Sequence, residues 1–168
     1  MRKVRLQATA FGYSADEAYR VLADFSRYPE HSEAVRSVTV TEVDRDISTS
    51  SWEVTFRSGI LRWTEEDRFD PIQHRIDFCQ FDGDIALFEG FWISVDTPEG
   101  CIITFTACLD MGMPTLADVL EPIAVNILLD NTASILQGLF GEGLRIETST
   151  AESLTDPKAI IDQAAGNP

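Results

Sequence analysis

The chain has 168 residues, a length that suits one domain able to bury roughly two-thirds of its unfolded surface without a disulfide or a metal ion. Its 13 basic and 28 acidic residues give a formal net charge of -15. A field of that sign repels phosphate backbones and anionic lipids, so the composition argues against a nucleic-acid partner. An acidic balance is otherwise common in soluble proteins and does not identify a substrate.

The sequence contains few signals for targeting or for a bound group. The opening residues MRKVRL lack the apolar stretch of a signal peptide, and no run approaches the roughly 18 apolar residues of a membrane span, so we expect a cytoplasmic protein. The three cysteines form no CxxC pair and only two histidines are present, so we expect buried, reduced thiols and no metal. Phosphate-loop and GxSxG patterns are absent as well, and we expect no cofactor.

The N-terminal part alternates between extended and helical patterns. Residues 3–12 carry apolar side chains at every second position, which predicts a half-buried strand. Ser14 and Glu17 have the spacing of a capping box and begin a predicted helix over residues 15–25. The polar segment 26–32 predicts a tight turn or a second short helix.

Extended segments separated by short, polar connections follow. The connections are rich in Asp, Gly, Pro and Ser, which favour hairpin turns. Strands joined by such short loops form an antiparallel meander. The predicted strands are residues 36–44, 50–58, 60–70, 74–82, 85–96 and 101–111.

The C-terminal part begins with a long helical pattern. Residues 114–141 carry apolar side chains at three- and four-residue spacing, which predicts a helix whose wide apolar face covers the sheet. Pro122 removes one backbone hydrogen bond, so we expect either a kink at this position or a helix start near Glu121. Residues 148–168 are mostly small and polar, and we interpret them as a disordered tail after a domain of residues 1–147.

This order of elements predicts an α+β helix-grip fold. One strand, two short helices, six further strands and a long helix give a curved antiparallel sheet of about seven strands around the C-terminal helix. Because such a sheet does not contact its helix everywhere, we expect an internal cavity between them. A cavity of this kind suits a hydrophobic or aromatic small molecule.

Two stretches of the sequence carry a resemblance to a known superfamily. Residues 15–30 (ADEAYRVLADFSRYPE) are similar to its opening helix and the aromatic-Pro-Glu turn that follows. Residues 81–92 look like its strand with a Gly-x-Trp centre. The chain therefore resembles the SRPBCC, or START-like, superfamily, in particular the polyketide cyclase/dehydrase group, which also contains coenzyme Q-binding proteins of the Coq10 type.

The resemblance implies a function and two catalytic residues. Aromatase/cyclases of this group fold a poly-β-keto chain inside the cavity and promote its aldol closure and dehydration, a step that belongs to antibiotic biosynthesis. Arg68 matches the position of their pocket arginine and would stabilise an oxyanion, and Tyr28 matches the aromatic before Pro-Glu and would donate a proton. The chain departs from the group in carrying Ser32 where an aromatic is expected and in lacking a histidine on the C-terminal helix.

Structural roles are the alternatives for the same residues. Arg68 has potential ion-pair partners in Glu66, Asp67 and the neighbouring strands, and packing of the loop is the alternative for Tyr28. Glu65, Glu66 and Asp67 form an acidic run that strand alternation divides between the two faces. We interpret the run as a solvated outer face that also supplies partners for arginines.

The remaining candidates are wall residues of the cavity and partners of the protein. Flat rings on the strands suit stacking against an aromatic ligand, and two asparagines interrupt the long apolar helix as potential carbonyl anchors. An acyl carrier protein and a second copy of the chain are the protein partners to be considered. The competing function is a non-catalytic carrier of a quinone or lipid, and a ligand-responsive protein of the same fold is a third. The expected substrate-binding residues are Trp63, Trp92, Phe88, Phe56, Asn126 and Asn131.

Overall fold

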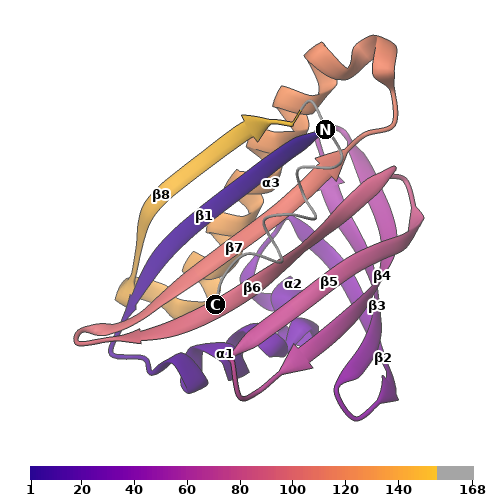
Figure 1. Ribbon diagram of the computed structural model, residues 1–168. Helices are drawn as coiled ribbons and strands as arrows, with labels where there is room; N and C mark the ends of the chain where they lie inside the picture. Colours follow the sequence, from indigo (N-terminus) through magenta and orange to yellow (C-terminus); the bar gives the residue numbers. More distant parts are fainter. Residues whose placement is uncertain (155–168) are drawn as a thin grey trace.

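The computed structural model describes residues 1–154 and contains one antiparallel sheet in that part of the chain. The sheet curves around a long helix, α3, which lies along its concave face (Figure 1). Its eight strands have the order β2-β3-β4-β5-β6-β7-β1-β8. The strands are β1 (Arg2–Phe11), β2 (Val35–Asp44), β3 (Ile47–Phe56), β4 (Gly59–Asp70), β5 (Arg75–Gly83), β6 (Leu87–Thr97), β7 (Gly100–Asp110) and β8 (Leu144–Ser153).

The helices fill the connections at the two ends of the meander. The short helices α1 and α2 follow β1, and α3 follows β7, in agreement with the sequence prediction. The core lies between the concave face of the sheet and these helices, where Leu22 of α1 and Leu136 of α3 are almost fully buried. The helical elements are α1 (Ala15–Ala23), η1 (Phe25–Arg27), α2 (Tyr28–His31), η2 (Pro114–Leu116), α3 (Ala117–Phe140) and η3 (Gly141–Gly143).

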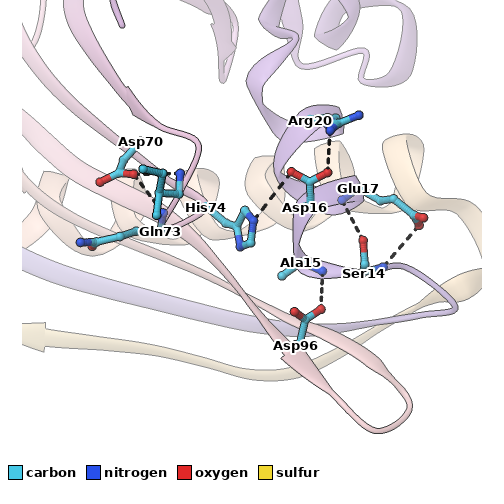
Figure 2. A network of polar contacts seen from close by, with 10 residues as sticks. Ser14, Ala15, Asp16, Glu17, Arg20, Asp70, Gln73, His74 and Asp96 are labelled. Carbon is cyan, nitrogen blue, oxygen red and sulfur yellow. Dashed lines mark hydrogen bonds and ion pairs between the residues drawn. The ribbon is translucent and has the colours of Figure 1, made fainter.

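The predicted capping box at the start of α1 is confirmed (Figure 2). The Ser14 hydroxyl accepts a hydrogen bond from the Glu17 backbone N–H at 3.1 Å, and the Glu17 carboxylate accepts one from the Ser14 backbone N–H at 3.3 Å. The next backbone N–H, of Ala15, donates to Asp96 Oδ1 on β6 at 2.7 Å. Side chains thus satisfy the free N–H groups of the first turn and attach α1 to the sheet.

Helix α3 begins upstream of Pro122. It starts at Ala117, so the alternative of a helix start near Glu121 is wrong, and Pro122 lies inside the helix. Residues Pro114–Gly143 are long and apolar enough to cross a membrane by length and composition alone. One face of α3, however, packs against the concave side of the sheet, with Ile135 and Leu136 in the hydrophobic core. We therefore interpret α3 as the core helix of the domain.

An eighth strand, β8, corrects the predicted domain boundary. The prediction of about seven strands omitted β8, which pairs antiparallel with β1 at the edge of the sheet. The domain continues beyond residue 147, and residues 148–153 of the predicted disordered tail are part of this strand. Residues 155–168 of the predicted tail lie outside the described residues. Most of β8 is exposed and polar, so it lacks the alternation that marks a half-buried strand.

The cysteines are placed only in part as expected. Cys101 and Cys108 are buried free thiols on β7, but Cys79 on β5 is exposed, which corrects the expectation that all three are buried. Cys79 lies near the end of the β5–β6 pairing, opposite Glu89. Within residues 1–154, no group of His, Cys, Asp and Glu side chains has an arrangement that could hold a metal ion.

Candidate functional site: an aromatic pocket with a buried carboxyl pair

A cavity with a volume of about 90 Å³ lies between the sheet and α3, and we call it the aromatic pocket. It is smaller than the roughly 300–1,000 Å³ of pockets that enclose drug-sized ligands. A ligand with more than one ring would therefore have to displace half-buried wall residues such as Leu128. The pocket is lined by Phe25, Tyr28, Val35, Trp52, Val54, Trp63, Glu65, Phe78, Phe88, Trp92, Phe105, Leu128, Asn131, Thr132 and Ile135.

Paired rings on neighbouring strands build the wall that the sheet contributes. Trp52 on β3 and Trp63 on β4 are directly opposite each other, and their rings stack with centroids 6.0 Å apart and planes 8° from parallel. Phe88 on β6 meets Trp63 edge-on at 5.5 Å, and Trp92 packs against Phe105 at 4.6 Å. All three tryptophans of the chain thus line the aromatic pocket.

Two carboxyl groups are buried in the same wall. Glu65 and Asp67 are two residues apart on β4, so both point to the inner face of the sheet, and we call them the carboxyl pair. Glu65 is 4% exposed and lines the aromatic pocket, and Asp67 is 0% exposed behind it. Buried acids are costly unless they are neutral or paired, which makes this pair the most unusual feature of the pocket.

Donors from β3 and β4 hold the carboxyl pair. Trp63 Nε1 donates to Glu65 Oε2 at 2.7 Å, and the Ser50 hydroxyl donates to Asp67 Oδ2 at 2.5 Å. Trp52 Nε1 in turn donates to the Ser50 oxygen at 2.8 Å. The stacked tryptophans therefore serve both as pocket wall and as hydrogen-bond donors to the polar cluster beneath it.

Burial shifts the acidities of the carboxyl pair upward. Desolvation and the neighbouring Asp67 charge raise the pKa of Glu65 well above its usual range, and desolvation raises the pKa of Asp67 to about 6. The ion pairs formed between described residues include neither carboxyl. Without a cation to offset two negative charges, the pair holds one proton at neutral pH.

The hydrogen bonds indicate that Glu65 carries this proton. The Ser50–Asp67 distance of 2.5 Å is typical of a hydroxyl that donates to an ionised carboxylate. Asp67 Oδ1 is buried and has no hydrogen-bond partner among the described residues, and the neighbouring Asp67 carboxyl contributes to the raised pKa of Glu65. A protonated Glu65 that donates to an ionised Asp67 satisfies both observations.

The structure brings together four of the expected substrate-binding residues. Trp63, Trp92, Phe88 and Asn131 all line the aromatic pocket. Phe56 packs against the core outside the lining, because it stands at the end of β3 beside the hairpin. The remaining expected residue, on α3, does not reach the pocket at all: the side chain of Asn126 is exposed.

The two residues expected to be catalytic are placed differently from their predicted roles. Arg68 points to the outer face of β4, where its side chain is 67% exposed and forms an ion pair with Glu66 at 2.8 Å. This is the ion-pair alternative, and it corrects the placement of Arg68 in the pocket. Tyr28 does line the aromatic pocket, but its buried hydroxyl donates to the Leu22 carbonyl at 2.6 Å, so its proton is already engaged. Burial also raises the pKa of Tyr28.

Sequence reasoning missed the carboxyl pair. The acidic run was expected to be a solvated face with partners for arginines, and this holds only for Glu66. The signal was the period of two: Trp63, Glu65 and Asp67 share a face, and an aromatic on that face marks it as the inner one. Ser50 and Trp52 of β3 complete the cluster. Their position beside these residues depends on how β3 pairs with β4, which the sequence of one strand does not show.

The fold and the pocket define the class of the protein. An antiparallel sheet wrapped around a long C-terminal helix, with short helices after the first strand and a cavity between the layers, is the helix-grip fold of START-like (SRPBCC) proteins. Residues 11–135 match the family described as "Polyketide cyclase / dehydrase and lipid transport", and the chain belongs to this family. No curated protein matched the chain.

Solved structures support the fold. TTHA0849 from Thermus thermophilus has a TM-score of 0.75 and 22% identity, covering 84% of this chain and 96% of that one. The Zhui aromatase/cyclase from Streptomyces sp. R1128 has a TM-score of 0.70 and 17% identity, covering 85% and 94%. A START superfamily protein from Mycobacterium smegmatis has a TM-score of 0.69 and 14% identity, covering 83% and 97%. At these identities the likeness establishes the fold alone.

Proposed function

We propose that this protein binds a polyketide or aromatic intermediate in the aromatic pocket and promotes its aldol cyclisation and dehydration. The observation that carries the proposal is the Glu65 carboxyl, buried in the wall of an otherwise aromatic cavity. Acid-base groups of perturbed pKa inside a pocket are typical of catalytic sites. Membership of the polyketide cyclase/dehydrase family supports the reaction class.

A carboxyl pair with one proton suits the proton transfers of an aldol closure. The pair takes a proton from the α-carbon, the resulting enolate carbon bonds to a ketone carbon, and the ketone oxygen receives a proton from the pair. Dehydration then removes a second α-proton and the new hydroxyl as water, leaving a carbon–carbon double bond. Glu65, which faces the pocket, is the candidate catalytic residue, and Asp67 is a positioning residue that acts through it.

The other wall residues would hold the substrate flat. Trp63, Trp92 and Phe88 offer ring faces and edges for stacking, and Tyr28 contributes to the same surface. Asn131 on α3 forms no side-chain hydrogen bond within the described residues, so its amide can anchor a substrate carbonyl. Arg68 has no part in this proposal because it lies on the other face of β4.

A carrier without catalysis is the second candidate. The mostly apolar lining of the pocket and the words "lipid transport" in the family description favour it, with a quinone or a lipid as cargo. In the catalytic case an acyl carrier protein would deliver the substrate, and the protein would act in the cytoplasm, as a monomer or a homodimer.

Product formation separates the two candidates. Purified protein is incubated with a linear aryl triketone, and cyclised, dehydrated product is followed by liquid chromatography and mass spectrometry. We expect wild type to form product and Glu65→Gln to lose at least about tenfold in rate, within the usual contribution of a general acid-base group. Glu66→Gln, on the outer face of the same strand, serves as the matched control and should keep wild-type activity.

Two other outcomes would contradict the catalytic proposal. Native mass spectrometry of the same samples shows whether the triketone is bound. Binding without any product above the uncatalysed rate would favour the carrier, and equal rates for wild type and Glu65→Gln would remove Glu65 from the mechanism.

A further inference from the structure

The carboxyl pair presents hydrogen-bond acceptors, and no donor, to the aromatic pocket. A protonated carboxyl has a single O–H donor, and we assign that of Glu65 to the buried Asp67 Oδ1, which has no other partner among the described residues. Its Oε2 atom already accepts the Trp63 N–H, and its Oε1 atom lies 3.4 Å from the Ser50 hydroxyl, but each carboxyl oxygen can accept more than one hydrogen bond. At this wall, Glu65 therefore offers a ligand only the free lone pairs of its carboxyl oxygens, which accept hydrogen bonds.

The nearby hydroxyl groups of the lining are engaged within the protein. The hydroxyl of Tyr28 donates to a backbone carbonyl at 2.6 Å, and that of Thr132 donates to the Leu128 carbonyl at 2.7 Å. Asn131 and Trp92 are the lining residues of the described chain whose side-chain N–H groups have no acceptor. The β4 wall thus offers acceptors and no free donor, whereas the free donors belong to α3 and β6, and the Asn131 amide on α3 carries an acceptor oxygen as well.

The charge of the site disfavours anions. Asp67 keeps one negative charge directly behind Glu65, and neither carboxyl forms an ion pair within the described residues. In a buried setting such a charge acts over several ångströms with little screening. The formal net charge of -15 adds to the repulsion of an approaching anion.

We infer that the aromatic pocket selects neutral ring compounds that donate a hydroxyl hydrogen bond to Glu65, namely phenols and enols, and rejects carboxylates of the same size. A carbonyl on the far side of the ligand would be received by Asn131. This inference rests on the aromatic pocket being the ligand site of the proposed function. The enol form of a β-diketone and a phenolic product both meet the requirement, whereas a free polyketide acid does not.

Three naphthalenes of similar size test the inference by isothermal titration calorimetry. 2-Naphthol carries the donor, 2-methoxynaphthalene is neutral but lacks it, and 2-naphthoate is an anion. We expect wild type to bind 2-naphthol at least about tenfold more tightly than either of the others, because each leaves an acceptor unpaired or adds a repelled charge. Equal affinities for 2-naphthol and 2-methoxynaphthalene in wild type would overturn the inference, whatever the variants do.

Substitution of Glu65 tests whether this residue is the source of the selectivity. Glu65→Gln retains a donor to Asp67 and an acceptor for Trp63 but turns its second amide hydrogen toward the pocket. The preference for 2-naphthol over 2-methoxynaphthalene should then fall by at least about fivefold. Unchanged selectivity would assign it to another group, and Glu66→Gln is the matched control that should leave it unchanged.

A second variant tests whether the small size of the pocket prevents the naphthalenes from binding. Leu128→Ala cuts back the α3 wall, so a failure of naphthalenes to fit wild type would be relieved in this variant. If neither protein binds any of the three compounds, the inference fails, and the triketone assay decides the proposed function separately. If 2-naphthol binds selectively while the triketone yields no product, the proposed reaction fails and the inference stands.

Discussion

Replacement of Asp67 by asparagine should stabilise the protein relative to wild type, by an amount that increases as the pH rises. Burial raises the pKa of Asp67 from 3.8 to about 6, so the folded state holds this proton more tightly than the unfolded state does. A raised acid pKa therefore makes folding less favourable as the pH rises from about 4 to about 6, and the loss is complete above that window. At about 1.36 kcal/mol per pH unit, the loss amounts to about 3 kcal/mol.

Asp67→Asn removes this titration while keeping the polar contacts. The amide oxygen of the new asparagine can accept from Ser50, and its NH₂ group can donate to Glu65, which then holds its proton on the other oxygen or loses it. We expect the variant and wild type to differ little at pH 4, and the variant to gain about 3 kcal/mol relative to wild type between pH 4 and pH 8. Urea unfolding followed by tryptophan fluorescence at several pH values measures this difference.

An exposed acid on the same strand provides the control. Glu66→Gln removes a surface ion pair with Arg68, and its effect should stay below about 1 kcal/mol at every pH. A difference between Asp67→Asn and wild type that does not change with pH, or a variant that becomes less stable as the pH rises, would refute the assignment of a costly buried charge to Asp67.

Three further substitutions test the fold around the pocket, each by urea unfolding. Ser14→Ala removes the cap of α1 and should cost about 1 kcal/mol, whereas no loss would show that the capping box contributes nothing. Gly138→Ala would drive a Cβ into the His31 carbonyl oxygen, so we expect a loss of about 1–3 kcal/mol, and an unchanged midpoint would contradict the close approach of α3 to α2. Leu136→Ala empties a fully buried position of α3 and should cost about 2–5 kcal/mol; a smaller loss would mean that α3 packs loosely.

Local signals predicted most of the fold. The Ser14–Glu17 box located the first helix because capping involves neighbours in sequence, and turn residues separated the strands of the meander for the same reason. Strand β8 was not predicted, because it pairs with a strand about 140 positions away in the sequence and most of its side chains are exposed. Leu144 and Ile146 pack against the core, but the exposed remainder of the strand is held mainly by backbone pairing with β1, which leaves no pattern in the side chains.

The candidate site was predicted in its aromatic part and missed in its polar part. Trp63 and Trp92 were expected in the wall because flat rings on the strands suit stacking against an aromatic ligand. The acids of β4 were predicted to face solvent because they are charged. The alternation of side chains along the strand, however, places Glu65 on the same face as Trp63. Arg68 was expected in the pocket through a resemblance, but alternation along β4 directs it to the opposite face from Asp67.

A crystal structure of the protein with 2-naphthol tests most directly whether the aromatic pocket is the ligand site. We predict that the ring lies between the tryptophans of the sheet and α3, with its hydroxyl oxygen within about 3 Å of a Glu65 carboxyl oxygen. A ligand found instead in the polar groove on the outer face of β2 to β4, around Ser37 and Thr64, would contradict this account of the pocket.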